Sequence, residues 1–312
     1  MKHIDFHHIS VMLEECIDGL AIRPNGIYVD GTAGGAGHSC EIAKRLSKPG
    51  RLIAIDKDPD AVAVASERLA DYPAAQVVQS DFSELCSVLD RLSIDSVDGI
   101  LLDLGVSSFQ LDTPDRGFSY MHDAPLDMRM SKSGLSAYDV VNTYDFKQLC
   151  RIFHDYGEER FTPATAKAIL RARETKPVET TGELSELIRQ AIPAKARRVG
   201  GHPAKRVFQA IRIEVNGELA SLSLFLEEAF DRLNPGGRMV IITFHSLEDR
   251  MVKRRFAQLC KGCTCPPDFP ICVCGNKPKG KLINRKPIEA SPQELLVNNR
   301  SKSAKLRIIE KL

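Results

Sequence analysis

A glycine-rich loop that follows an acid is the first feature of this sequence that could do chemistry. The apolar run at 26–29 ends at Asp30, and the loop Gly31–Gly37 leads into a helix-like segment at 39–46. A strand, a tight turn and a helix N-terminus present bare backbone that a nucleotide can approach closely. By itself the pattern is a weak signal, because such turns also occur for structural reasons alone.

Acids follow three further strand-like runs, at 51–56, 75–79 and 97–103. The acids at or just after the four strand ends are Asp30, Asp56, Asp81 and Asp103. In an open parallel sheet the carboxyl ends of the strands form the binding crevice, where Asp56 would accept hydrogen bonds from ribose hydroxyls. The structural alternative is that these acids cap the following helices.

The charge of the loop favours one cofactor. A dinucleotide fingerprint requires G-x-G-x-x-G, and Gly35-Ala-Gly37-His-Ser-Cys40 lacks the third glycine. Four carboxylates would repel a pyrophosphate but attract a sulfonium and an amino group. The sequence therefore favours S-adenosylmethionine, with its ribose at Asp56 and its adenine against Phe82.

Several long motifs carry a resemblance to a known family. They stand at 30–39, 55–58, 100–108, 116–119, 125–130, 156–161, 202–203, 208–212 and 244–250. Together, from about residue 7 to residue 306, the chain resembles the bacterial 16S ribosomal RNA cytosine-N4 methyltransferases. The resemblance implies cofactor contacts at Ala36, Gly37, His38, Asp56, Phe82, Asp103 and Gln110. Many members of that family have Gly where this chain has Ala36, and the extra methyl group could narrow the approach to the cofactor.

The resemblance also implies a substrate, namely a cytosine in the decoding region of 16S ribosomal RNA within the small subunit. The exocyclic amine of cytosine is a poor nucleophile, so an acceptor must draw its hydrogen and localise the lone pair; Asp103 or the carbonyls of 104–107 would do this. Methylation at ring carbon five would need a cysteine nucleophile, usually after proline, and the chain has no Pro-Cys pair. Two alternatives stay open: a methyltransferase acting on another RNA, a small molecule or a protein, and a nonenzymatic RNA-binding ribosome assembly factor.

The strand pattern predicts an α/β fold: a doubly wound, mostly parallel, Rossmann-like methyltransferase sheet with an inserted helical domain. The pattern stops near Ser108 and resumes at 238–243, after a predicted turn at 234–238. The predicted core is 1–111 with 213–312, and the predicted substrate-recognition insert is 112–212. Apolar residues at helical spacing predict helices in the insert near 136–153, 163–174, 181–191 and 204–213. His245, after the last strand, is expected to hold a loop rather than to catalyse.

Composition indicates a cytoplasmic enzyme. The chain has 312 residues, 43% of them hydrophobic, and no apolar run near the roughly 20 residues of a membrane span, so no membrane partner is expected. Nine cysteines and no signal-peptide pattern favour reduced thiols. The net charge of +2 excludes a uniformly basic nucleic-acid binder, and no DNA partner is expected. Both a monomer and a homodimer remain open.

Basic residues and cysteines concentrate near the end of the chain. Residues 251–286 contain nine Lys and Arg against one acid, and a second basic cluster lies at 195–206. Such patches predict binding to a phosphate backbone, although a solvated helix face would look similar at 253–255. In the same segment Cys263, Cys265, Cys272 and Cys274 have paired spacing, which fits either a structural zinc site or free thiols.

Overall fold

The computed structural model describes residues 10–197, 202–263, 265, 271 and 273–312. It divides into two compact units, Met1–Gly105 with Ala220–Leu312, and Val106–Leu219. The second unit starts earlier and ends later than the predicted insert at 112–212.

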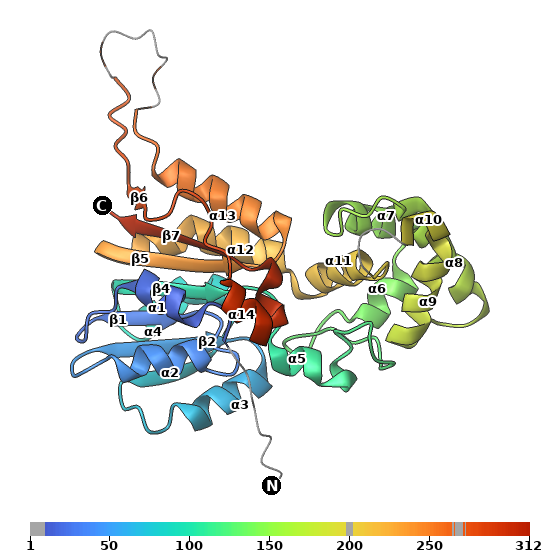
Figure 1. Ribbon diagram of the computed structural model, residues 1–312, viewed down its shortest axis with the longest axis horizontal. Helices are drawn as coiled ribbons and strands as arrows, with labels where there is room; N and C mark the ends of the chain where they lie inside the picture. The colour runs from blue at the N-terminus through green and yellow to red at the C-terminus, as the bar shows by residue number, and fades with distance from the viewer. Residues whose placement is uncertain (1–9, 198–201, 264, 266–270, 272) are drawn as a thin grey trace. The chain divides into compact units, whose positions relative to one another are not determined.

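A seven-stranded sheet forms the centre of the first unit (Figure 1). Its spatial order is β3-β2-β1-β4-β5-β7-β6, in which β1 to β5 run parallel and β7 is antiparallel to both β5 and β6. The strands are β1 (Ile27–Asp30), β2 (Arg51–Asp56), β3 (Ala75–Gln79), β4 (Val97–Asp103), β5 (Leu233–Thr243), β6 (Gly280–Leu282) and β7 (Lys305–Lys311). The predicted doubly wound, mostly parallel sheet is confirmed.

Helices cover both faces of this sheet because side chains alternate along each strand. In β2, Ile53 and Ile55 face one core with α4 (Leu85–Arg91), α12 (Glu218–Glu228) and α13 (Ser246–Leu259). Leu52 and Ala54 face the other core, with α1 (Leu13–Leu20), α2 (Gly37–Lys44) and α3 (Pro59–Arg68). The shorter elements of this unit are η1 (Phe82–Glu84), η3 (Ala229–Arg232), α14 (Pro292–Val297) and η4 (Asn299–Ser303).

The fifth strand begins earlier than the sequence predicted. Leu233 already pairs with Val97, and the register then shifts so that Arg238 pairs with Gly99. The predicted turn at 234–238 is therefore wrong: these residues form an irregularity inside β5, with Gly236 at φ 76°. Burial of Leu233 in the core favours the longer strand.

The second unit is helical and has its own apolar core. Its helices are α5 (Ser108–Asp112), η2 (Pro114–Arg116), α6 (Ala137–Thr143), α7 (Phe146–Asp155), α8 (Thr162–Thr175), α9 (Thr181–Ala191), α10 (Ala194–Arg197) and α11 (Lys205–Asn216). The helix predicted at 136–153 is in fact two helices. Tyr144 is extended, and Asp145 caps α7 in a reciprocal pair with Gln148, which starts a new helix.

Among the described residues, the helices are too short or too polar to span a lipid bilayer.

Candidate active site

The loop after β1 is clamped between two neighbouring strands. The amide of Gly31 donates to Leu101 O of β4 at 2.9 Å, and the amide of Ala33 donates to Ile55 O of β2 at 2.9 Å. The hydroxyl of Thr32 accepts from the amide of Asp103 at 2.7 Å. The glycine loop is therefore positioned by the carboxyl ends of three parallel strands, as the sequence predicted for a binding edge.

Small residues allow this loop to enter α2. A Cβ on Gly37 would lie 1.9 Å from Ser10 Oγ, so the close approach of these two residues requires glycine. Ala36 has φ 60° and ψ 23°, a left-handed conformation that favours glycine, and it is fully buried. Its methyl group therefore packs into the core, and the conformational cost falls on the backbone.

Two acids at the ends of β1 and β2 accept hydrogen bonds from the loop and the residues next to it. Asp30 accepts from the hydroxyl of Ser39 at 2.6 Å and from the amide of Thr32 at 3.1 Å. Asp56 accepts from the amides of Gly34 and Asp58 at 2.8 and 2.9 Å. Burial raises the pKa of both carboxyls to about 6, and these hydrogen bonds oppose that rise.

Asp103, at the end of β4, has the most perturbed environment of these acids. Its Oδ1 is buried and has no hydrogen-bond partner among the described residues. Burial, followed by repulsion from Asp30, Glu248 and Glu294, raises its pKa from 3.8 to about 8. The carboxyl is therefore mostly protonated at pH 7, until a positive charge approaches it.

His38, in the first turn of α2, lies beside Asp103. Its Nε2 is 3.1 Å from Val11 O, and its Nδ1 is 3.9 Å from Asp103 Oδ2, which is too long for a hydrogen bond. Burial lowers the pKa of His38 to about 4, so the ring is neutral at pH 7. Because Val11 O accepts, Nε2 must carry the proton, and Nδ1 is left unprotonated toward Asp103.

The third strand contributes an acid and a ring. Asp81 caps η1 through the amide of Ser83 at 2.9 Å, and its other oxygen lies 3.3 Å from Lys57 Nζ. Burial would raise the pKa of Asp81, but Lys57 and the Ser83 bond together lower it. Phe82 packs edge-on against Phe225 at 5.8 Å, and its Cβ lies near Gly31 at the base of the loop.

Two acids near Asp103 were not identified from the sequence. Glu248, in α13, accepts from the amides of Phe244 and His245 at 2.8 and 3.2 Å. Glu294, in α14, accepts from the amide of Met12 at 2.9 Å. Glu248 lies within the 244–250 motif and Glu294 in no motif, but the sequence relates neither to β4, so only folding reveals their effect on Asp103. His245 caps α13 through Glu248, a structural role like the one expected.

The structure brings most of the predicted site residues together. Five of them lie at the carboxyl ends of β1 to β4 or in the loops that follow: Ala36, Gly37, Asp56, Phe82 and Asp103, with His38 in the first turn of α2. Gln110 lies in the second unit, where its side chain accepts from the amide of Ser107 at 3.0 Å in a capping box. Cys263, Cys265 and Cys274 lie close together elsewhere in the first unit, and Cys272 is outside the described residues.

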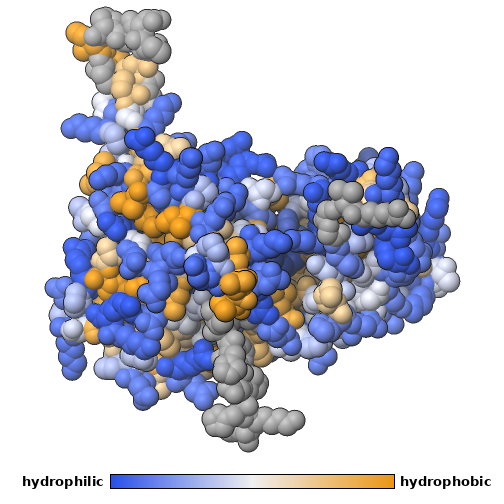
Figure 2. All heavy atoms as spheres, in the orientation of Figure 1, coloured by the Kyte–Doolittle hydropathy of each residue, from blue (hydrophilic) through white to orange (hydrophobic). Residues whose placement is uncertain are grey.

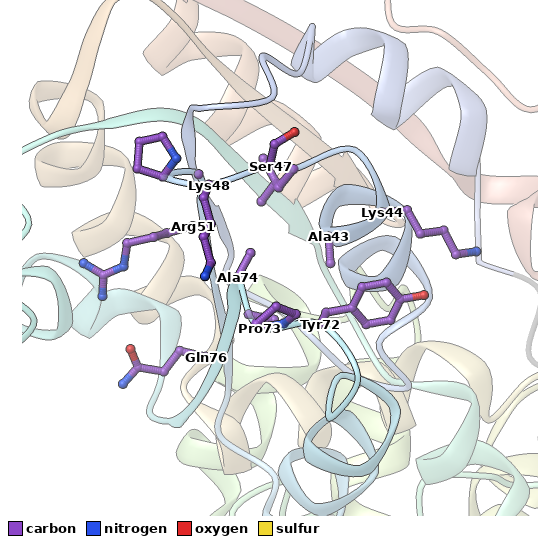
Figure 3. A pocket seen from close by; sticks show the side chains of 13 residues that line it. Ala43, Lys44, Ser47, Lys48, Arg51, Tyr72, Pro73, Ala74 and Gln76 are labelled. Carbon is purple, nitrogen blue, oxygen red and sulfur yellow. The ribbon is translucent and has the colours of Figure 1, made fainter.

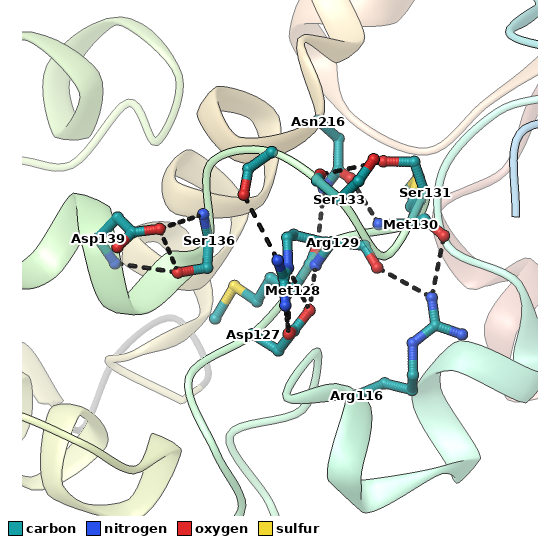
Figure 4. Close-up of polar contacts among 11 residues, drawn as sticks. Arg116, Asp127, Met128, Arg129, Met130, Ser131, Ser133, Ser136, Asp139 and Asn216 are labelled. Atoms are coloured by element: carbon teal, nitrogen blue, oxygen red, sulfur yellow. Dashed lines mark hydrogen bonds and ion pairs between the residues drawn. The ribbon is translucent and has the colours of Figure 1, made fainter.

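A braced loop in the second unit carries the 125–130 motif (Figure 4). The buried Arg116 donates to the carbonyls of Arg129 and Met130 at 2.9 and 3.1 Å. Asn216 accepts from the amide of Met130 and donates to the carbonyl of Met128, both at 2.8 Å. Two side chains from distant segments thus fix the loop backbone, including Met128 at φ 59°.

The same unit carries a cluster of rings, of which only His202 is exposed, and exposed positive charge. Tyr120 stacks on His202 with ring centroids 4.4 Å apart, and Phe208 packs edge-on against Tyr120 at 5.6 Å. Lys195, Lys205 and Arg206 of the predicted basic cluster are exposed; Arg198 lies outside the described residues.

A hollow of about 680 Å³ lies at the other edge of the sheet (Figure 3). It is lined by the starts of β2 and β3, including Arg51 and Ala75, and by Lys44, Lys48 and Tyr72. These are the amino ends of the strands, opposite the acids, and the hollow is therefore not the predicted binding edge.

The acidic edge fits a ligand that has a positive charge and a ribose. The buried, unpartnered Oδ1 of Asp103 would gain a favourable interaction with a cation, and the glycine loop offers backbone close to it. The residues present therefore fit S-adenosylmethionine and would repel a pyrophosphate.

Comparisons with known proteins agree with this chemistry. The model of the MraW methylase family matches residues 5–312. The chain is 59% identical to ribosomal RNA small subunit methyltransferase H 2 of Agathobacter rectalis, over 99% of both chains. It is 58% identical to ribosomal RNA small subunit methyltransferase H of Lachnospira eligens, again over 99% of both chains. It is 57% identical to the protein of that name from Clostridium botulinum, over 99% of this chain and 100% of the relative.

Proposed function

The chain belongs to the MraW methylase family, and from that membership we propose that it transfers a methyl group from S-adenosylmethionine to the N4 amine of a cytosine in 16S ribosomal RNA. It is a methyltransferase, as are its relatives at 57–59% identity. Their printed names support RNA of the small ribosomal subunit as the substrate. The choice of cytosine N4 in the decoding region rests on the motif resemblance.

The observation that carries the cofactor assignment is the unpartnered, buried oxygen of Asp103 at the glycine-loop edge. S-adenosylmethionine, when bound, supplies an electrophilic methyl group on a positively charged sulfonium. A cation beside Asp103 would lower the pKa of its carboxyl from about 8 and leave it ionised at pH 7.

We assign the cofactor contacts to the residues that the motifs indicate. The backbone of Ala36 and Gly37, at the N-terminus of α2, would face the methionine part of the cofactor. Asp56 keeps free lone pairs beyond its two backbone bonds and would accept from the ribose hydroxyls. The remaining proposed contacts are His38, Phe82, Asp103 and Gln110.

Asp103 is the proposed catalytic residue. The lone pair of the cytosine amine is delocalised into the ring, so the nitrogen must be held in line with the methyl group and made more pyramidal. An ionised Asp103 would accept a hydrogen bond from the amine and localise that lone pair. As the N–C bond forms, the amine becomes acidic and the positive charge beside Asp103 is lost, so the pKa of Asp103 would return toward about 8 and the carboxylate could accept the proton of the amine.

We assign substrate recognition to the second unit. Its exposed Lys195, Lys205 and Arg206 suit a phosphate backbone, and the Tyr120–His202 stack offers ring surface of the kind on which unpaired bases stack. The target cytosine must be unstacked to react, so a single-stranded or flipped nucleotide is the expected substrate.

Methyl transfer to defined RNA tests the proposal. Small ribosomal subunits and naked 16S ribosomal RNA, both from a strain lacking this methyltransferase, are incubated with the protein and labelled S-adenosylmethionine. Digestion to nucleosides and mass spectrometry should show N4-methylcytidine with at least one of the two substrates. Label on another atom or another base, or none on either substrate, would contradict the proposal.

A further inference from the structure

A narrow hairpin joins α13 to β6, and neither the fold nor the proposed reaction accounts for its cysteines. Its described residues, 260–263, 265, 271 and 273–279, are defined here as the cysteine hairpin. The amide of Lys279 donates to Leu259 O at 2.8 Å, and the side-chain amide of Asn276 donates to Lys261 O and Gly262 O at 3.1 and 2.6 Å. In Figure 1 the two orange arms run side by side away from the sheet.

Three sulfur atoms meet in this hairpin. The Sγ atoms of Cys263, Cys265 and Cys274 all lie within 4.8 Å of one another, and those of Cys263 and Cys274 are 3.7 Å apart. Two thiolates bound to one tetrahedral zinc ion, each at about 2.3 Å, lie about 3.8 Å apart. We propose that these three cysteines bind a structural zinc ion as thiolates.

A hydrogen bond and the surrounding charge also suit metal-bound sulfur atoms. The amide of Cys265 donates to Cys263 Sγ at 3.4 Å, a contact of the kind that orients metal-bound sulfur. Lys261, Lys277 and Lys279 are exposed in the same hairpin, and their positive charges would offset the negative charge of a zinc–thiolate centre.

The described residues of the hairpin bury little apolar surface. Ile271 and Val273 are 74% and 72% exposed, and hydrophobic residues stand uncovered on the projecting hairpin in Figure 2. A segment that buries so little apolar surface needs a cross-link or a metal to hold one conformation. The Sγ atoms of Cys263 and Cys274 are 3.7 Å apart, far beyond the roughly 2.05 Å of a disulfide between them. A single disulfide would also leave the third sulfur of the cluster unused.

The proposal rests on these three described sulfurs. Three thiolates leave one position of a tetrahedral site, which a water molecule would fill; Cys272, also expected from the spacing, lies outside the described residues. The zinc site does not depend on the proposed function. Its consequence for that function is to fix the arm that carries Lys277, Lys279 and Lys281.

Metal analysis tests the proposal on the full chain. Protein purified under reducing conditions and dialysed with equimolar zinc should retain about one zinc per chain by elemental analysis. The double variant Cys263→Ser/Cys274→Ser should retain at least tenfold less. The variants Cys86→Ser and Cys150→Ser, which change cysteines in other elements, should retain as much as the unchanged protein. Circular dichroism and the melting temperature of the double variant would show that the sheet unit still folds.

Cobalt gives a second readout that is independent of activity. Equimolar Co²⁺ added to the metal-free protein should produce intense thiolate-to-cobalt charge-transfer absorption, which the double variant lacks and added zinc removes. Absence of this absorption, equal zinc in the double variant, or a disulfide mapped to the hairpin in freshly isolated protein would overturn the site. None of these results would bear on methyl transfer itself.

Discussion

At the scale of single residues, the behaviour of this site centres on Asp103. Three other carboxylates, Asp30, Glu248 and Glu294, raise its pKa together with burial, and none of them compensates its charge. Asp103 is therefore mostly neutral at pH 7, and a cationic ligand beside it would favour its ionised form. A pKa value that burial and neighbouring charges shift this far is typical of functional sites.

The variant Asp103→Asn keeps the size of the side chain but removes its charge. We expect single-turnover methyl transfer at saturating S-adenosylmethionine to fall about 10²-fold or more, the range for loss of one preorganised electrostatic group. If Asp103 only anchored the cofactor, saturation would restore the rate, since losses of uniform binding appear in the apparent affinity. A normal rate and a normal affinity together would remove Asp103 from the active site.

The raised pKa of Asp103 also predicts how stability depends on pH. Between its unfolded value near 3.8 and its folded value of about 8, the folded protein binds a proton that the unfolded chain does not. Stability from this group is therefore present at low pH and lost as pH rises through 8, by up to about 1.4 kcal/mol per pH unit. The pKa values of Asp30 and Asp56 are about 6, so these two acids contribute little between pH 7 and 8.5, and comparison with Asp103→Asn in this window measures the effect of Asp103.

Urea unfolding of the ligand-free protein at pH 7 and 8.5 measures this effect. The free energy of unfolding should fall with pH in the unchanged protein, and the fall should be clearly smaller in Asp103→Asn. His38, with its pKa of about 4, acts with the opposite sign at lower pH and does not contribute in this window. Identical slopes in the two proteins would contradict the raised pKa.

At the scale of elements, the loop between β1 and α2 depends on close packing against the segment before α1. Gly37 opens α2, and a Cβ there would lie 1.9 Å from Ser10 Oγ and 3.3 Å from Ser10 Cβ. The loop therefore depends on contacts made far outside its own sequence. Its two ends are held by β2 and β4 as described above.

Gly37→Ala should destabilise the protein by about 1–3 kcal/mol through this overlap, as overpacking does in other cores. Removing the hydroxyl with Ser10→Ala should recover part of that loss in the double variant, because the nearest contact then disappears. Chemical denaturation of the four proteins forms a double-mutant cycle. Strictly additive effects would show that Ser10 and Gly37 do not meet.

At the scale of the whole molecule, a net charge of +2 conceals a separation of charge in the first unit. Acids gather at the carboxyl edge of the sheet, whereas exposed lysines gather on the cysteine hairpin and β6. One run of exposed apolar residues in the first unit lies on α14, where Leu295, Leu296 and Val297 are 40%, 87% and 68% exposed, and hydrophobic spheres lie at that helix in Figure 2. This charge distribution suits a cationic cofactor and an anionic polymer on different parts of one unit.

The variant Lys277→Gln/Lys279→Gln/Lys281→Gln should weaken binding of the RNA substrate. The slope of log affinity against log salt should become less steep by about 2, because fewer counterions are released when fewer phosphates are neutralised. Affinity for S-adenosylmethionine should not change. The matched control is Lys48→Gln/Arg91→Gln, which removes exposed charges elsewhere on the first unit. A salt slope equal to that of the unchanged protein would mean that the three lysines only face solvent.

Local pattern alone determined much of this protein. Apolar runs that end in acids predicted β2, β3 and β4 with their bounds, because strand alternation and burial are properties of neighbouring residues. The glycine loop and the four acids predicted the binding edge for the same reason, since parallel strands bring their carboxyl ends together. Prediction failed where helical spacing and a capping signal coincided: Asp145 caps a new helix after Tyr144, within a stretch whose apolar spacing predicted one continuous helix.

The tertiary structure decided what depends on distant segments. The pKa of Asp103 reflects Glu248 and Glu294, which lie far along the chain and reach β4 only through folding. The early start of β5 depends on the pairing of Leu233 with Val97. The contact between Cys263 and Cys274 depends on the hairpin, which the cysteine spacing alone did not predict. Electrostatic energy and strand register are set by distances in space, and sequence spacing constrains those distances only within a single element.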